Sequence, residues 1–517
     1  MIARPTPRPS RVASLAVLVL YVAWVTFVVA TPVLGAWVAS SLAAYSNGPV
    51  RVAAATGLLL FPVLPVAWEG WATLRRRRRG VTAKRFLTWG DRLILRTLTV
   101  NLLFLGAVLG ARPAAAFAAL STRGDWMLDG RTGTRVDTAR HWLFRAADRL
   151  EWLYLAVHVD TFAEKNRSPA PSSTPSTTPS PASSRPTSPA SSTPAPSSVA
   201  SSTPTPPPSS SSTSREPSGS DDAPAALKAE WPLAPTLHPA VASMPASVET
   251  SIESVAGYLA DREKTPEGRL KAAHDWVADR IAYDVPSYRT RRFPPQDAKS
   301  VFDARTGVCA GYSALFGALA SALGFEVVYV SGDARTEGMD EKGEGHAWNA
   351  VRMGDRYVLV DTTWDSGTVK GDTFTKRYIT DYYETPPEVF SSNHFPSDAR
   401  WQLRGEPISR GDFFRQAMMT PRFYAQHREL VSPTRSQVTV RGPLEVLMRA
   451  PARLYTSATW SVRGREERTH CEVTRGELVR VTCALPAVGA YTVNLFSNEA
   501  EYGTYEFVGE VEANREE

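Results

Sequence analysis

Three residues in the middle of the chain, Cys309, His346 and Asp361, have the types and the order of a nucleophilic site. Cys309 opens an apolar run, and Gly324 follows this run at the place where a helix commonly ends. A thiol in the first helical turn is favoured as a thiolate, because the helix dipole and the free backbone N–H groups stabilise negative charge. The same N–H groups are candidate donors to an oxyanion. The sequence therefore predicts a reactive cysteine at the start of a helix.

The histidine and the aspartate stand on either side of a predicted hairpin turn at residues 353–356. A turn centred there places Asp361 opposite Trp348. It also places His346 opposite Thr363. His346 and Asp361 are then diagonal neighbours on one face of the hairpin, about 7–8 Å apart at the backbone, which their side chains can span. In such a pair the carboxylate holds one imidazole nitrogen while the other takes the proton of the thiol.

Each residue of this group also has a plain structural interpretation. A lone cysteine in an apolar helix is more often a small buried residue than a nucleophile, and a histidine and an aspartate can simply share a sheet. These interpretations explain the residues one at a time. They do not explain why all three fall together, so we favour the nucleophilic site.

The residues ahead of the site predict two helices, in SVETSIESVAGYLAD and TPEGRLKAAHDWVADRIAYD. The second helix begins with Thr265 as its N-cap and Pro266 in the first position. His274 lies off the apolar stripe of this helix and is expected at the surface. After the cysteine helix the pattern changes to a strand, FEVVYV, and then to the hairpin. The region therefore predicts an α+β core.

The stretch GVCAGYSALF, followed by GHAWNAVRMGDRYVLVDTTWD, resembles the transglutaminase-like superfamily of papain-like folds, and within it the kyphoscoliosis peptidase branch. YYETPPEVFSSNHFPSDARWQL is similar to the segment that follows the core in that branch. The resemblance covers about residues 245–405 and extends loosely into the C-terminal region. It does not include the apolar N-terminal part.

This resemblance implies roles for the three residues. Cys309 would be the nucleophile, His346 the general base and Asp361 the partner that orients the histidine. The expected reaction is attack on an amide carbonyl to form a thioester acyl-enzyme. Water would then give hydrolysis, and an amine would give a cross-link. The sequence does not choose between these two outcomes.

Five further residues near the motif are weaker candidates. Trp348 and Trp364 are expected to line the substrate cleft, with core packing as the equal alternative. Gln296 and Tyr283 lie upstream, where related enzymes place a side chain that supports the oxyanion, but neither is assigned that role. His394, in NHFP, is expected to be structural rather than catalytic.

The sequence excludes several other classes of function. It contains no metal-ligand spacing, phosphate-binding loop or dinucleotide fingerprint, so we expect no metal and no cofactor. A net charge of +6 could indicate nucleic acid, but the one dense basic run, residues 75–79, lies between apolar segments, where membrane topology explains it better. No nucleic-acid recognition fold accompanies the charge.

Three apolar segments, at about residues 12–42, 50–74 and 93–111, predict a multi-pass membrane anchor within residues 1–120. A signal peptide is the competing interpretation of the first segment, although the apolar run continues well past any such cleavage site. The N-terminus and the loop between the second and third segments are basic and are expected in the cytoplasm. Three crossings then place the catalytic region outside the cytoplasm. If the third segment only lies on the membrane, that region would be inside.

The remaining boundaries follow from composition and pattern. Residues 121–165 contain an amphipathic helical segment, and residues 166–225 form a Ser/Thr/Pro-rich linker that is expected to be disordered, because it cannot bury enough apolar surface. Residues 233–405 form the catalytic domain. Residues 406–517 contain six alternating segments typical of a β-sandwich.

The overall expectation is an α+β transglutaminase-like/papain-like core, preceded by transmembrane helices and a disordered linker and followed by a β-sandwich-like domain. Cys471 and Cys483 could pair in an oxidising compartment, or could remain free. The leading hypothesis is a membrane-anchored cysteine peptidase or acyltransferase that acts on protein or peptide substrates outside the cytoplasm. The alternative is a scaffold or binding protein that keeps the fold without turnover. A sensor of the envelope state is a weaker third interpretation.

Overall fold

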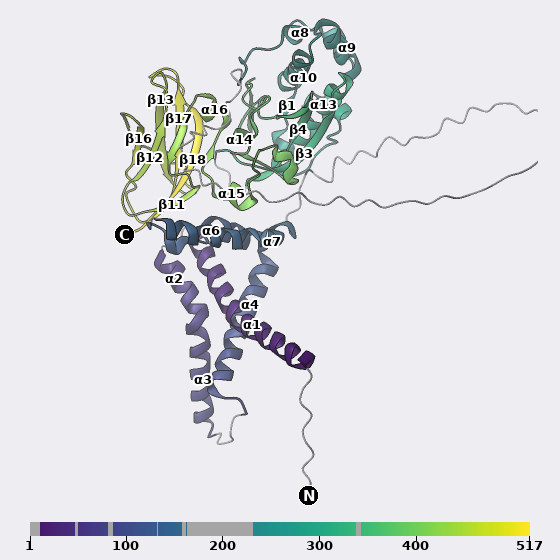
Figure 1. Ribbon diagram of the computed structural model, residues 1–517. Coiled ribbons are helices and arrows are strands. Elements are labelled where there is room, and N and C mark those ends of the chain that lie inside the picture. The colour runs from purple at the N-terminus through teal and green to yellow at the C-terminus, as the bar shows by residue number, and fades with distance from the viewer. Residues whose placement is uncertain are drawn as a thin grey trace, which may run out of the picture. The chain divides into compact units, whose positions relative to one another are not determined.

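The computed structural model describes residues 11–46, 50–80, 86–131, 133–157, 162, 231–337 and 343–517 (Figure 1). The described residues belong to one compact unit of the chain. The predicted linker at residues 166–225 lies outside the described residues, so its expected disorder stays a prediction.

Three helical segments near the N-terminus are long and apolar enough to cross a membrane, as expected: Val17–Tyr45, Val50–Arg78 and Trp89–Ala111. They are built from α1 (Arg11–Tyr45), α2 (Val50–Leu58), the π-turn η1 (Leu59–Val63), α3 (Leu64–Arg78) and α4 (Trp89–Ala111). The capping box of Thr88 and Asp91 fixes the start of α4.

Glu69 and Asn101 are among the polar residues buried inside these segments. Glu69 on α3 is buried and forms ion pairs with Arg92 and Arg96 of α4, each at 2.9 Å. Asn101 is also buried, and a Cβ atom on Gly35 would lie 2.1 Å from its Oδ1 atom. An unpaired charge is costly in a membrane, so the Glu69–arginine pairs explain how α3 and α4 tolerate these residues.

The amphipathic pattern expected at residues 121–165 is divided between two helices. The helices of this region are α5 (Pro113–Arg123), the 3-10 turn η2 (Trp126–Leu128), α6 (Thr134–Asp148) and α7 (Glu151–Leu155). Trp142 on α6 and Trp152 on α7 are 65% and 62% exposed, so each presents a large apolar ring to its surroundings. Rings in this position suit a membrane surface.

The region that the sequence predicts to be catalytic begins with helices. They are α8 (Pro239–Ala242), the 3-10 turn η3 (Ala246–Val248), α9 (Ile252–Arg262), α10 (Pro266–Arg280), α11 (Val285–Thr290), α12 (Ala298–Ala304) and α13 (Cys309–Ala322). Thr265 caps α10 as predicted, and its Oγ1 atom accepts from the N–H of Gly268 at 3.1 Å. Gly324 follows α13 with a φ of 94°, which confirms the predicted helix end.

A four-stranded sheet in the order β5-β4-β3-β8 packs against α13 (Figure 1). The strands are β3 (Val327–Ala334), β4 (Glu344–Met353), β5 (Arg356–Val360) and β8 (His394–Pro396), with a short parallel pair, β1 (Ala282–Tyr283) and β2 (Thr306–Gly307), and a hairpin, β6 (Gly367–Lys370) and β7 (Thr373–Lys376). The main core lies between α9, α10 and α13 and the sheet, around Trp276 and Phe316.

The remainder forms a β-sandwich, as expected. Short helices and turns lead into it: α14 (Pro387–Phe390), η4 (Ala399–Gln402), α15 (Arg410–Arg415) and α16 (Pro421–Ala425). The six expected strands are β11 (Gln437–Val440), β12 (Leu444–Arg449), β13 (Tyr455–Val462), β16 (Val479–Cys483), β17 (Gly489–Asn498) and β18 (Glu506–Arg515). The sequence analysis did not predict β9 (Met418–Met419), β10 (Glu429–Ser432), β14 (Thr469–His470) and β15 (Glu472–Arg475).

Two sheets make up the sandwich. One has the order β10-β12-β16-β15, and the other has the order β11-β18-β17-β13-β14, with β9 beside β18. Their apolar faces meet in a core that includes Val446, Val481 and Val493. Cys471 and Cys483 are disulfide-bonded, which resolves the alternative that the sequence left open.

Candidate active site

The cysteine stands at the first position of α13, with Val308 as the N-cap. The side chain of Gln296 is buried beside this helix start, and its Oε1 atom accepts from the N–H of Val308 at 2.9 Å. A Cβ atom on Gly311 would lie 2.5 Å from the same oxygen, so a glycine is required for Gln296 to come this close. Gln296 therefore fixes the backbone one residue before Cys309. The sequence alone assigns Gln296 no oxyanion role.

The hairpin has the register predicted from the sequence. Met353 pairs with Arg356, and Asn349 pairs with Val360. Asp361 follows β5 directly, and its Oδ2 atom lies 2.7 Å from Nε2 of His346 on β4. The sheet thus brings the histidine and the aspartate together as diagonal neighbours.

His346 lies between a carboxylate and a thiol. Its Nε2 atom bonds Asp361, and the Cys309 side chain is close enough to the ring to be one of the causes that raise its pKa. Burial alone lowers the pKa of His346, but the charge of Asp361 and the contact with Cys309 outweigh it and raise the pKa to about 10. Burial raises the pKa of Asp361, but the two histidines beside it have the larger effect and lower that pKa well below its usual range. The arrangement thus favours an imidazolium next to the sulfur.

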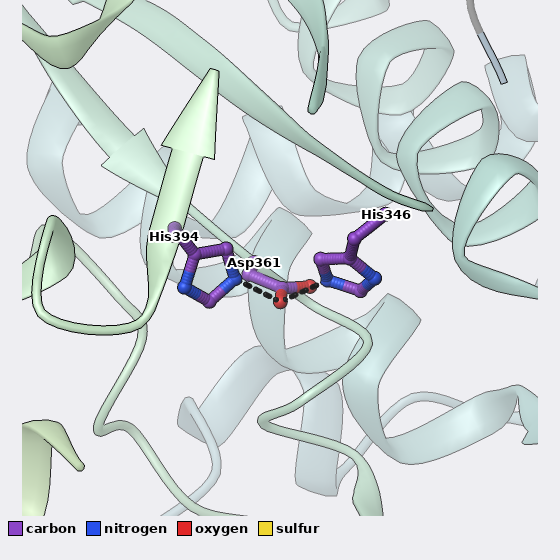
Figure 2. A group of neighbouring side chains, drawn as sticks. All are labelled: His346, Asp361 and His394. Carbon is purple, nitrogen blue, oxygen red and sulfur yellow. Dashed lines mark hydrogen bonds and ion pairs between the residues drawn. The ribbon is translucent and has the colours of Figure 1, made fainter. Parts of the chain in front are cut away.

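A second histidine, His394 of β8, approaches the same carboxylate (Figure 2). Its Nε2 atom lies 3.3 Å from Oδ2 of Asp361, and its Nδ1 atom lies 2.9 Å from the side-chain amide of Asn393. Burial, with a contribution from the charge of His346, lowers the pKa of His394 to about 4. A neutral His394 can donate to Asp361 without adding a second positive charge. The structural role expected for His394 is compatible with this contact, but the contact itself was not foreseen.

His346, Asp361 and His394 also form a group that could hold a metal ion, with one atom from each lying within 4.8 Å of the others. The sequence spacing did not indicate this group. Histidine and carboxylate ligands lie about 2.0–2.2 Å from a zinc ion. Here both ring nitrogens face one carboxylate oxygen, at the hydrogen-bond distances of 2.7 Å and 3.3 Å. The donor set therefore fits a hydrogen-bonded triad better than a metal site.

The two tryptophans expected at the cleft differ in exposure. Trp348 is 1% exposed and packs with Leu359 and Phe390, so it is a core residue. Its ring is stacked at 6.1 Å from that of His346 and limits how the imidazole can turn. Trp364 is half-buried, and its ring centroid lies 5.1 Å from that of His346. A substrate contact for Trp364 stays a prediction.

The expectation that His274 lies at the surface is wrong. The residue is fully buried, with Nδ1 at 2.9 Å from Asp275 and Nε2 at 3.0 Å from Asp365. Burial lowers the pKa of His274, but the two carboxylates outweigh burial and raise it. Through its bond to Asp365, the ring connects α10 to the turn after Asp361. Asp365 also accepts from the N–H of Tyr382. Helical periodicity missed His274 because its partner lies far away in the sequence.

A comparison with protein families matches residues 253–362 to the transglutaminase-like superfamily. This range includes all three residues of the nucleophilic group. This part of the chain is a transglutaminase-like domain. The resemblance seen in the sequence is thereby confirmed, together with the α+β core that it implied.

The relatives of the transglutaminase-like domain include two kyphoscoliosis peptidases. The Mus musculus protein is 27% identical over 264 residues, and the Homo sapiens protein is 26% identical over 262 residues. Each match covers 48% of this chain and 39% of the relative, so the chain spans about two fifths of the length of these curated relatives. A solved structure described as a crystal structure of a TGase is 18% identical over 26% of this chain and 35% of that chain, with a TM-score of 0.20. That structure carries no argument about the site.

Proposed function

We propose that the transglutaminase-like domain is a cysteine enzyme that attacks amide bonds of protein or peptide substrates. The observation that carries the proposal is the position of the His346 ring, which bonds the Asp361 carboxylate through Nε2 and lies close enough to Cys309 for the thiol to help raise its pKa. This order of nucleophile, base and orienting carboxylate is the one that acyl transfer requires.

The proposed reaction has two steps. In the first, the thiolate of Cys309 attacks the amide carbonyl carbon, and the oxyanion accepts from backbone N–H groups at the start of α13. The C–N bond breaks as His346 donates its proton to the leaving amine, which leaves a thioester on Cys309. In the second, water or an amine attacks the thioester and gives its proton to His346, and the cysteine is released. Water yields a carboxylic acid, and an amine yields a new amide.

A scaffold without turnover is the alternative. It would use the same fold, with the β-sandwich as its working surface. The buried pairing of His346 with Asp361 supports the enzyme over the scaffold. A buried charged pair contributes little net stability, so a scaffold would gain little from it, whereas an enzyme needs it to orient the base.

We also propose that the domain acts outside the cytoplasm, on a multi-pass membrane anchor in contact with lipid. The basic residues of the loop between α3 and α4 support this orientation. The pairing of Cys471 with Cys483 supports it too, because disulfides persist mainly in oxidising compartments.

The experiment is a proteomic comparison of cells that carry the wild-type chain with cells that carry Cys309→Ala. A hydrolase should produce new protein termini, and a transamidase new isopeptide cross-links, only with the wild-type chain. A matched control is Cys471→Ala with Cys483→Ala, which leaves Cys309 in place. Identical termini and cross-links in wild type and Cys309→Ala would favour the scaffold.

A further inference from the structure

Phe162 is buried next to the nucleophile, although it comes from a distant part of the chain. It is 2% exposed and belongs to a small apolar cluster with Val308, Cys309, Ala310 and Ala347. In the sequence, Phe162 follows α7 of the anchor region and precedes the transglutaminase-like domain. Cys309 itself is 2% exposed.

Aromatic side chains of the transglutaminase-like domain surround this phenylalanine. The rings of Phe162 and Phe293 meet edge to face with centroids 6.0 Å apart, and the Tyr329 hydroxyl donates to the carbonyl oxygen of Phe162 at 3.4 Å. Tyr283 and Tyr288 pack against the same cluster, with their rings 5.9 Å apart. The four rings that face Phe162 and its cluster are half-buried, and we call them the aromatic pocket.

The aromatic pocket adjoins the reacting sulfur. Tyr283 pairs with Gly307, two residues before Cys309, and burial, followed by the charge of Cys309, raises the pKa of Tyr283. Tyr329 lies on β3, next to the strand that carries His346. A peptide whose carbonyl carbon reaches the sulfur must therefore place a neighbouring side chain near these rings.

The aromatic pocket is separate from the main core of the domain. The core around Trp276 and Phe316 does not include Phe162, which belongs to the smaller cluster at the start of α13. Phe162 thus fills an apolar site next to Cys309 and is not part of the main core of the domain. Burial of a phenylalanine side chain in an apolar site is favourable, so Phe162 can compete with a weakly bound peptide.

We propose that the aromatic pocket is the subsite for a bulky apolar, preferably aromatic, side chain of the peptide substrate, and that Phe162 occupies it in cis and covers Cys309. This inference rests on the proposed function. The chain then carries its own competitive occupant, and substrates without a large apolar side chain cannot displace it.

The test measures alkylation of Cys309 by iodoacetamide in the full chain, purified in detergent, with mass spectrometry of the Cys309 peptide as the readout. We expect Phe162→Ala to raise the second-order rate constant about tenfold, since the aromatic cover is lost. Phe162→Leu keeps an apolar occupant and should stay close to wild type. Trp152→Ala removes an exposed ring from α7 of the same anchor and should change nothing.

The second arm adds N-acetyl-phenylalanine amide or N-acetyl-alanine amide to the Phe162→Ala chain. The phenylalanine compound should slow alkylation back toward the wild-type rate, and the alanine compound should not. Equal rates in wild type and Phe162→Ala, or equal protection by the two amides, would overturn the inference.

A further variant separates this inference from the proposed function. His346→Ala in the Phe162→Ala chain should alkylate slowly near neutral pH, because the imidazolium that supports the thiolate is gone. If it alkylates as fast as Phe162→Ala alone, the cover by Phe162 stands but the proposed function fails. Thermal unfolding of each variant checks that the fold is intact.

Discussion

The Asp361 carboxylate contacts both His346 and His394, and the pKa values of the two histidines shift in opposite directions. The charge of Asp361 raises the pKa of His346 to about 10 in spite of its burial, whereas burial lowers the pKa of His394 to about 4. At neutral pH the pair therefore contains one imidazolium, next to the thiol, and one neutral ring. His394 acts on Asp361 rather than on a substrate, so we regard it as a positioning residue.

We expect His394→Phe to lower the rate of Cys309 alkylation near neutral pH by about tenfold, because a hydrogen bond to a charged group is worth about 1.5–3 kcal/mol. The aromatic ring fills the same apolar site beside Phe390 and Trp364. His394→Gln keeps an N–H near the position of Nε2 and should restore most of the rate. Equal losses for the two variants would mean that His394 only fills space.

The buried His394 also predicts how stability depends on pH. Its pKa is lowered from 6.5 to about 4, so between these values the unfolded chain binds a proton that the folded chain does not. Stability should therefore fall as the pH drops from 6.5 to about 4, with an upper bound of roughly 3 kcal/mol for this residue. In urea unfolding, the free energy of unfolding of His394→Gln should fall less steeply than that of wild type as the pH drops. Parallel curves for variant and wild type would show that His394 is not held neutral.

At the scale of elements, the strand order β5-β4-β3-β8 brings together the side chains of His346, Asp361 and His394. The helix start at Cys309 and the hairpin register could be predicted, because capping signals and strand pairing across a short turn are local. The place of β8 could not, because it pairs with β3 across about sixty residues of chain, and no local pattern records such pairing. The same reason applies to His274, whose partner Asp365 lies 91 residues further along the chain.

Gly332 makes the approach of β8 to β3 possible. A Cβ atom there would lie 2.2 Å from the carbonyl oxygen of Phe395 and 2.9 Å from the ring of Trp348. We expect Gly332→Ala to push β8 away, to destabilise the domain by about 1–3 kcal/mol and to slow Cys309 alkylation. Gly257→Ala, on α9 with no atom near its new methyl group, should be neutral or slightly stabilising by thermal unfolding. Similar melting shifts for both would contradict this account.

At the scale of the whole molecule, the polar residues of the apolar segments are arranged for a membrane. Glu69 pairs with Arg92 and Arg96 between α3 and α4, so these charged residues of the apolar segments are paired with one another. Beyond the segments, Asp125 pairs with Arg435 at 2.8 Å and so joins the anchor region to the β-sandwich. The three segments could be predicted from hydropathy alone. The pairing of their charged residues could not, because it depends on how α3 and α4 pack.

The orientation across the membrane predicts the behaviour of reporter fusions. A phosphatase that folds only outside the cytoplasm should be active when fused after residue 225 and inactive when fused after Gly80, in the basic loop. Activity of the second fusion, or inactivity of the first, would overturn the three-crossing topology. Thiol counting provides a check: the unreduced chain should show one reactive cysteine, and the reduced chain three.

The central claim is that His346 and Asp361 keep Cys309 ready as a nucleophile, and the pH profile of Cys309 alkylation tests it most directly. Because the pKa of His346 is raised to about 10, its ring stays charged between about pH 6 and pH 9. If this charge keeps Cys309 as a thiolate, the wild-type rate constant should be nearly flat over the same range. The His346→Ala rate should rise with pH as an ordinary thiol's does, and at pH 6.5 should be at least about tenfold below wild type. If the two profiles rise together, the three residues do not form a nucleophilic site.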